Sequence, residues 1–333
     1  MSKWFKTAIF GAATLLLAVG PLFVATSATA ADAGSTGQGL EISPPVIELS
    51  ANPGQTVTTS IRVRNVTKGE LIAKGKADDF GASASEDGQP KLLLDETGAT
   101  RFSLKFWLQG VPDLTLAPGE LKTTVIKIVV PANAEPGGHF GVVRFTALPP
   151  SLEGTGVALS ASIGALILLK VSGAITEKVS LAEFSTTQTT TQKGKQPITR
   201  IASFFEHGPV DFLVRVRNEG TVHEKVTGTI DVKDTFGKKI GSVAVNDKGG
   251  NVLPDSVRRF EQSLSNKQLF GHYTAALVLN YSSGKTLAGK IGFWVIPWKL
   301  VLLGLVGLIV LFFVLKMALR RYNDHIIAQA RRR

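Results

Sequence analysis

The chain has 333 residues, with 37 Lys and Arg against 26 Asp and Glu, and it has no cysteine. The lack of cysteine excludes disulfide bonds, thiol catalysis and Cys-ligated metal sites, and in an exported chain it fits a bacterial surface protein. The net charge of +11 would suit a nucleic-acid partner, but residues 1–30 contribute +2 and residues 316–333 contribute +5, which leaves +4 for residues 31–299. We therefore expect no nucleic-acid partner.

The N-terminal segment has the three parts of a secretory signal. Lys3 and Lys6 precede an apolar run over residues 8–25, and residues 28–30 (ATA) form a small-x-small cleavage site. This pattern predicts a signal peptide over residues 1–30. Whether it is cleaved stays open, because an uncleaved first membrane helix would have a similar sequence.

Alternating apolar and polar residues run through most of the chain between the predicted signal peptide and the C-terminal apolar segment, which we call the predicted exterior. In residues 55–65, for example, Ile61 and Val63 fall on one face and Arg62 and Arg64 on the other. The same period of two occurs in residues 121–130, 210–218 and 271–281. Such runs between Pro, Gly, Asn and Asp turns predict antiparallel sandwiches.

We therefore predict an all-β chain of two tandem immunoglobulin-like β-sandwiches followed by one C-terminal transmembrane helix. The predicted parts are a signal peptide at residues 1–30, a first Ig-like domain at 40–175, a second at 176–294, a transmembrane helix at 295–315 and a basic cytoplasmic tail at 316–333.

Two short segments each recur later in the chain, and the two repeats are separated from their originals by nearly the same number of residues. Residues 61–65 (IRVRN) are echoed 153 positions later by residues 214–218 (VRVRN), and residues 79–81 are echoed 156 positions later by residues 235–237. The near-equal spacings indicate two related modules, with chance as the alternative.

One tryptophan is left for the predicted exterior. Residues 101–108 alternate as a strand would, and Trp107 falls on the polar face of that strand. An exposed ring can stack on a sugar, so Trp107 is a candidate binding residue, with a core position as the alternative.

Two regions lack the regular spacing of apolar residues that predicts a strand or a helix. Residues 186–197 predict a flexible loop or linker. A cluster of acids predicts a solvated loop or loose hairpin, and as alternatives it could supply a hydrolytic carboxylate pair or a calcium site. These acids are Asp78, Asp79, Glu86, Asp87, Asp95 and Glu96.

The sequence contains no recognisable catalytic motif. The five histidines have no zinc-site spacing, and there is no nucleophile elbow, P-loop or dinucleotide fingerprint. We expect no enzymatic activity, no catalytic residue, no cofactor and no metal.

The C-terminal segment predicts a membrane anchor. Residues 295–315 would span roughly 31 Å as a helix, about the hydrocarbon thickness of a bilayer. Tryptophan and lysine mark one predicted interface and basic residues the other, which places the C-terminal tail in the cytoplasm. These anchors are Trp294, Trp298 and Lys299 at the outer interface and Lys316, Arg320 and Arg321 at the inner one. The prediction is a single-pass type I protein of the plasma membrane with most of the chain extracellular. No LPxTG-like sorting signal precedes the helix.

The second predicted sandwich carries an N-x-G-x-x-H motif at Asn218, Gly220 and His223, followed by D-x-F-G-K-K at residues 234–239. Other motif segments are residues 43–45, 53–56, 118–119, 131–141, 269–273 and 293–298. Over about residues 1–320, the chain resembles the DUF916-type bacterial surface proteins and is similar to the WxL-interacting proteins of Gram-positive bacteria.

This resemblance implies a first domain that binds peptidoglycan and a second that binds a host or partner protein. Thr221 stands where that family often has Asn, and His139 where Tyr is frequent, so the partner is not carried over. Asn218 and His223 are candidate binding residues, with a structural role in a turn as the alternative.

The leading functional hypothesis is a non-enzymatic, membrane-anchored cell-surface protein that presents its domains to peptidoglycan, another cell-wall glycan or another surface protein. Sheet edges and loops would make the contacts. The alternative is a membrane-tethered chaperone or assembly factor for exported subunits. A cell-wall hydrolase is the third hypothesis.

Overall fold

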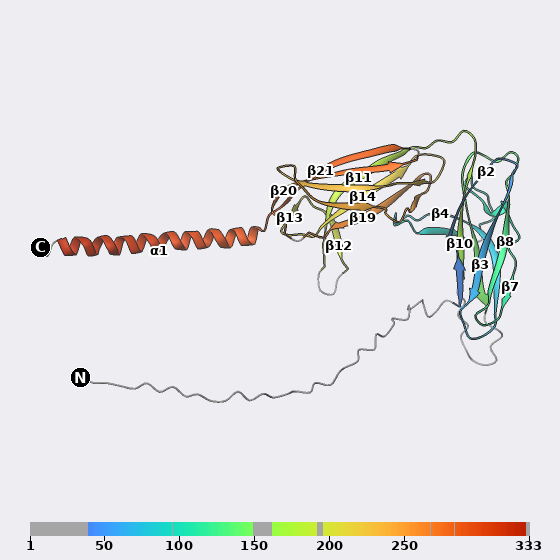
Figure 1. The fold of residues 1–333 in the computed structure, drawn as a ribbon, viewed down its shortest axis with the longest axis horizontal. Helices are drawn as coiled ribbons and strands as arrows, with labels where there is room; N and C mark the ends of the chain where they lie inside the picture. Colours follow the sequence, from blue (N-terminus) through green and yellow to red (C-terminus); the bar gives the residue numbers. More distant parts are fainter. Residues whose placement is uncertain are drawn as a thin grey trace, which may run out of the picture. The chain divides into compact units, whose positions relative to one another are not determined.

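The computed structural model describes residues 39–94, 96–148, 162–191, 196–266, 268–282 and 284–330 (Figure 1). The predicted signal peptide and Asp95 lie outside these residues. The chain folds as two β-sandwiches followed by one C-terminal helix, which is the predicted fold class.

The first sandwich is built from two facing sheets. Its strands are β1 (Leu40–Ser43), β2 (Val46–Ala51), β3 (Thr56–Asn65), β4 (Leu71–Ala82), β5 (Pro90–Leu93), β6 (Leu108–Gln109), β7 (Leu114–Leu116), β8 (Leu121–Val129), β9 (Gly137–Leu148) and β10 (Ser162–Val171). One sheet has the order β1-β3-β8-β6, and the other has the order β2-β10-β9-β4-β5, with β7 paired to β4.

The second sandwich has a similar plan. Its strands are β11 (Val179–Thr190), β12 (Ile198–Ile201), β13 (Phe204–Phe205), β14 (Val210–Asn218), β15 (Glu224–Lys225), β16 (Thr227–Asp234), β17 (Lys239–Val245), β18 (Asn251–Val252), β19 (Ser256–Leu264), β20 (Gly271–Tyr281) and β21 (Lys285–Val295). The sheets have the orders β12-β11-β14-β19 and β13-β21-β20-β16-β17, and β15 pairs with β18.

The two sandwiches share one strand arrangement. Strand β3 lies between β1 and β8 as β14 lies between β11 and β19, and the parallel pair β2/β10 has its counterpart in β13/β21. The first sequence echo ends at Asn65 in β3 and at Asn218 in β14, and the second falls in the β4–β5 and β16–β17 hairpins. The first echo therefore occupies equivalent strands in the two modules, whereas the second lies within strand β4 in the first module and in the β16–β17 turn in the second.

Each sandwich has its own apolar core, formed by the inward residues of the alternating strands. Ile61 and Val63 of β3 and Ile126 and Ile128 of β8 are fully buried in the first core. Phe212, Val214 and Val216 of β14 and Ala275, Leu277 and Leu279 of β20 are buried in the second. The period of two thus predicted these buried faces.

The strand predicted over residues 101–108 is wrong. The structure has a 3₁₀ turn at Lys105–Trp107, and β6 begins only at Leu108. The carboxylate of Asp79 accepts hydrogen bonds from the backbone N–H groups of Leu104 (2.9 Å) and Lys105 (2.8 Å), which draws this segment out of an extended conformation.

The loop predicted over residues 186–197 is also partly wrong. Strand β11 extends to Thr190, and its last residues pair with β12 as a hairpin. The hydroxyl of Thr186 donates to the carbonyl of Ala202 (2.5 Å), and β-branched threonines suit a strand even without an apolar face.

Two acids predicted to lie in a solvated region are buried. Asp78 is 2% exposed and pairs with Arg144 (3.0 Å), and Asp79 is 3% exposed and accepts from the Ser103 hydroxyl and from two backbone N–H groups. Both carboxylates are buried because donors match their charge; Asp79 lies on the inner face of β4, and Asp78 lies on the outer face that it shares with Phe80.

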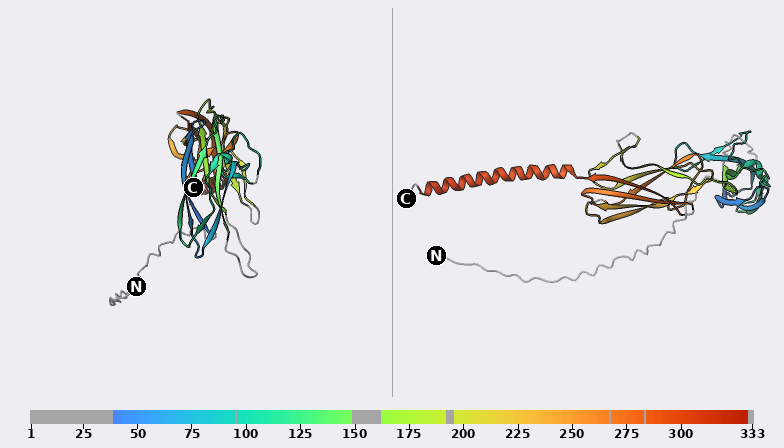
Figure 2. Two further views of the ribbon diagram at one scale, coloured as in Figure 1. Left: turned by 90° about the vertical axis from the view of Figure 1, so that its right-hand side faces the viewer. Right: turned by 90° about the horizontal axis from the view of Figure 1, so that it is seen from above.

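Helix α1 runs from Trp298 to Ala330, so it begins three residues later than predicted and continues through the predicted tail (Figure 1). Val295 belongs to β21, where it pairs with Phe205 and Gly271. The segment Trp298–Asn323 has a mean hydropathy of 2.8, and in the described part of the chain it is the one helix long and apolar enough to cross a membrane. The right-hand view of Figure 2 shows the red helix α1 following directly on the second sandwich.

Candidate binding site at the junction of the two sandwiches

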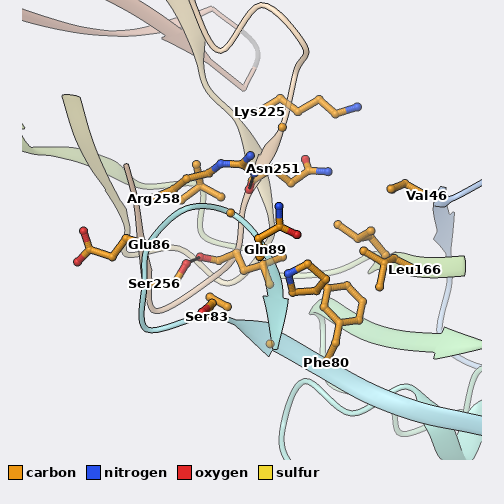
Figure 3. Close-up of a pocket in the computed structure, with 18 of the residues that line it drawn as sticks. Val46, Phe80, Ser83, Glu86, Gln89, Leu166, Lys225, Asn251, Ser256 and Arg258 are labelled. Atoms are coloured by element: carbon orange, nitrogen blue, oxygen red, sulfur yellow. Dashed lines mark hydrogen bonds between the residues drawn. The ribbon is translucent and has the colours of Figure 1, made fainter. Parts of the chain in front are cut away.

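A cavity of about 390 Å³ lies where residues of the two sandwiches meet (Figure 3). Its floor is apolar and comes from the first sandwich: Val46 of β2, Phe80 of β4, and Leu166 and Leu168 of β10. These residues lie on the outer face of their sheet, because the alternate residues Ile167 and Leu169 fill the first core. Leu253 of the second sandwich packs against the same cluster. The floor is therefore an apolar patch that the second sandwich covers only in part.

The opposite wall is basic. Lys225, Lys248 and Arg258 line it from the second sandwich, and Figure 3 shows Lys225 and Arg258 on the side away from Phe80 and Leu166. Burial lowers the pKa of Arg258, which nevertheless stays a cation at neutral pH.

The guanidinium of Arg258 is held by backbone rather than by an acid. Its Nη1 donates to the carbonyl of Asn251 (2.6 Å), and its plane lies 5.4 Å from the ring of Phe260. A Cβ atom at Gly88 or at Gly250 would overlap it, so a larger residue at either position would displace the guanidinium. Its Nε is buried and finds no partner among the described residues.

Both acids of the cavity are already paired. Glu48 accepts from Lys225 (2.7 Å) and from the side-chain amide of Asn251 (2.8 Å). Burial raises the pKa of Glu48, but these hydrogen bonds outweigh it and the pKa is lowered overall. Glu86 is bound by Arg215. The cavity therefore combines an apolar floor with two cations, Lys248 and Arg258, that form no ion pair with an acid of the described residues.

Glu86 links the two sandwiches. From the β4–β5 hairpin it forms a bidentate pair with Arg215 of β14, with Nε–Oε2 at 2.7 Å and Nη2–Oε1 at 2.6 Å. Arg215 also contacts Glu183 of β11 (3.2 Å), and the hydrogen bond from Arg215 lowers the pKa of Glu86. The backbone carbonyl of Glu86 accepts from the N–H of Arg259 (2.7 Å).

A double-mutant cycle on Glu86→Gln and Arg215→Met should give a coupling free energy of about 1 kcal/mol, because the pair has good geometry but is partly open to solvent. Urea unfolding of the full chain measures it. Lys239→Met with Asp231→Asn, an exposed pair within one hairpin, is the control and should couple by less. A coupling near zero for Glu86 and Arg215 would contradict the link between sandwiches.

His223 lies at the same junction. Its ring packs edge-on to Phe140 of the first sandwich at 5.8 Å, and its Nδ1 is buried without a partner among the described residues. Burial lowers the pKa of His223 to about 4, although the charge of Glu48 acts in the opposite direction. The structure thus brings this predicted residue to the junction of the two sandwiches as a neutral, packed ring.

The folded-state pKa of His223, about 4, lies below the ordinary 6.5, so the native state resists protonation. Its contribution is fully present above about pH 6.5 and should be lost as pH falls towards 4, at a cost of about 2–3 kcal/mol. His223→Gln removes this titration. Between pH 6.5 and 4, the free energy of unfolding should fall more steeply for the wild-type protein than for the variant. Parallel curves for the two proteins would contradict the assignment.

The other two predicted binding residues lie elsewhere. Asn218 is fully buried, and its amide donates to the carbonyls of Val222 (2.7 Å) and Val252 (2.8 Å) while its oxygen accepts from the N–H of Gly220 (2.8 Å). This is a structural role in a turn. Trp107 is partly buried against the first core, and its ring centroid lies 4.3 Å from that of His139.

The sheet that forms the floor is open along part of one edge. Strand β2 covers β10 only from Leu166 to Val171, whereas Ser162–Ala165 pairs with β9 alone among the described residues. Leu166 is the first covered residue and also lines the cavity. Among the described residues, Ser162–Ala165 is therefore an unpaired half of the β10 edge that ends at the cavity, although β1, which pairs with β3, lies in contact with β10.

The described residues hold no group of three or more His, Asp or Glu side chains that could bind a metal ion. Of the key residues of the junction, the sequence singled out only Glu86, as one of the clustered acids, and not Arg215 or Arg258. These residues come from different modules, so no local pattern joins them.

No family model matches the sequence, and a search of curated proteins found no match. Among solved structures, the class 5 fimbriae chaperone CfaA has 15% identity and a TM-score of 0.38, with coverage of 75% of this chain and 98% of that one. The chaperone DraB of E. coli has 11% identity and a TM-score of 0.35, with coverage of 76% and 96%. The chaperone CupB2 of Pseudomonas aeruginosa has 11% identity and a TM-score of 0.36, with coverage of 77% and 100%. Scores this low carry no conclusion about partners or activity.

Proposed function

We propose that this chain is a membrane-tethered, non-enzymatic assembly factor that holds an extended segment of another exported protein. The observation that carries the proposal is the uncovered half-edge of β10, which ends at an apolar cavity. The proposal rests on this geometry and not on the likeness to fimbrial chaperones.

An open sheet edge presents unpaired N–H and C=O groups, which an added strand satisfies. Alternate side chains of such a strand would point to one face, beside the apolar side chains of Val46 and Leu166. The cavity volume of about 390 Å³ is within the usual range for a binding pocket. Arg258 and Lys248 would favour a segment that carries an acidic group.

In this proposal the membrane anchor would hold the site outside the cell. Trp294, Trp298 and Lys299 would lie at the outer interface of the plasma membrane, and Lys316, Arg320 and Arg321 at the inner one, as the positive-inside rule requires. The sandwiches would then be extracellular, in a single-pass type I topology. Trp107, the residue proposed for a cell-wall glycan, is partly buried against the first core and lies outside the cavity lining.

Photo-crosslinking in the native membrane tests the proposal. A p-benzoylphenylalanine in place of exposed Ser162 should give an adduct with another exported protein, through a segment of alternating apolar residues. The same probe in place of Val278, which is exposed on a strand paired along both edges, is the control. No adduct at 162, or equal adducts at both positions, would contradict strand addition.

The cavity is tested in the same assay. Leu166→Asp places a charge in the apolar floor and should lower the adduct yield at 162 by at least about tenfold. Leu92→Asp on β5 lies outside the cavity lining and should leave the yield unchanged. Circular dichroism of both variants shows whether the fold is kept.

A further inference from the structure

The end of the second sandwich next to α1 carries most of the exposed aromatic side chains of the sandwiches. Among the described residues these exposed aromatics are Phe106, Phe204, Phe236, Phe270 and Trp294. All but Phe106 belong to the second sandwich. Phe236 is 93% exposed and Phe270 is 69% exposed, which is unusual for such large apolar rings.

The strand register brings these four residues to one end of one sheet. Phe204 of β13 is paired with Trp294 of β21, and Trp294 is paired with His272 of β20. Phe270 comes directly before β20. On the next strand, the β16–β17 hairpin turns at Phe236, and the hydroxyl of Thr235 donates to the carbonyl of His272 (3.0 Å). Four sequence-distant segments thus form one aromatic rim.

The membrane helix begins at the same end. Trp298 follows the last residue of β21, Val295, by three residues, a reach of at most about 10 Å. This connection is fixed by hydrogen bonds and charge, since the N–H of Ile296 donates to the carbonyl of Phe205 (2.8 Å) and Lys299 pairs with Glu206 (2.9 Å). The aromatic rim therefore stays close to the point where the chain enters the bilayer.

We infer that this rim rests in the outer leaflet, with Phe236 and Phe270 inserted at the boundary between headgroups and acyl chains. The headgroup layer is about 5–8 Å thick on each side of the hydrocarbon, so the rim lies within its reach. Aromatic rings favour this layer, and an interfacial segment typically buries its apolar side about 5–10 Å deep. Lys238, exposed beside Phe236 and without an ion pair among the described residues, would bind lipid phosphate.

The natural absence of cysteine allows a site-specific test on the full chain in lipid nanodiscs. Single cysteines at Lys238→Cys, which keeps Phe236, and at Asp247→Cys, past the other end of β17, are labelled with the fluorophore NBD. The label at 238 should be quenched by doxyl-labelled phosphatidylcholine and shielded from aqueous iodide by at least about threefold. The label at 247 should be quenched by aqueous iodide and unaffected by the doxyl-labelled lipid.

Phe236→Ser and Phe270→Ser, added to Lys238→Cys, should restore iodide quenching and reduce lipid quenching. Equal iodide quenching at 238 and 247 would overturn the inference. So would a label at 238 that is shielded from iodide but unaffected by doxyl lipid, because the rim would then be covered by protein.

Discussion

Asp79→Ala is expected to lower the free energy of unfolding of the first sandwich by about 4–6 kcal/mol, since it leaves several buried donors without an acceptor. The carboxylate of Asp79 accepts from the Ser103 hydroxyl and from the backbone N–H groups of Leu104 and Lys105. The side-chain ammonium of Lys105, 9% exposed, lies 3.7 Å from it. The alanine side chain satisfies none of these groups.

Urea unfolding of the full chain, with Trp294→Phe and Trp298→Phe in every variant, measures this effect through the fluorescence of Trp107, which ends the turn that Asp79 holds. Asp79→Asn keeps an oxygen acceptor and should be less damaging. Asp87→Ala, an exposed acid in the neighbouring hairpin, should change stability by less than about 0.5 kcal/mol. Equal effects of Asp79→Ala and Asp87→Ala would contradict the buried network.

Asn218→Ala should destabilise the second sandwich by about 3–5 kcal/mol, and Asn65→Ala the first by a similar amount. Each amide is fully buried at the end of a central strand. Asn65 donates to the carbonyls of Gly69 (2.7 Å) and Leu116 (3.0 Å), and its oxygen accepts from the N–H of Thr67 (2.8 Å). Asn218 makes the same set of bonds in its own module.

Amide hydrogen exchange assigns each loss to its module, since the two substitutions should loosen different sandwiches. Asn280→Ala, exposed on β20, is the matched control and should be nearly neutral. A loss below about 1 kcal/mol at either buried asparagine would contradict the equivalent role of the two residues.

The strands that alternate cleanly were predictable because one face of each is buried and the other is solvated. Residues 55–65, 121–130, 210–218 and 271–281 all follow this rule. The echo of residues 61–65 in residues 214–218 also pointed correctly to equivalent strands. Local pattern was sufficient in these cases since burial itself imposes the period of two.

Elements that depend on distant partners were not predictable in this way. The segment at residues 101–108 alternates, yet the buried carboxylate of Asp79 holds it as a turn. Val295 has the hydropathy of a membrane residue, yet its pairing with Phe205 and Gly271 keeps it in the sheet.

The candidate site was missed for the same reason. Its floor is the outer face of β2, β4 and β10, where apolar residues look like a doubly buried strand, and its basic wall lies more than fifty residues farther along the chain. Only the fold places Leu166 opposite Arg258 (Figure 3). The motif residue Asn218 proved structural, while His223 lies at the junction.

Amide hydrogen exchange of the full chain most directly tests whether β10 accepts a partner strand. A synthetic peptide spanning the segment crosslinked at position 162 is added at saturation, and exchange is compared with that of the free protein. Binding at the half-edge predicts that exchange within Ser162–Ala165 slows by at least about tenfold, while Thr274–Val278 of the fully paired strand β20 is unchanged. Unchanged exchange within Ser162–Ala165 in the presence of bound peptide would contradict strand addition at β10.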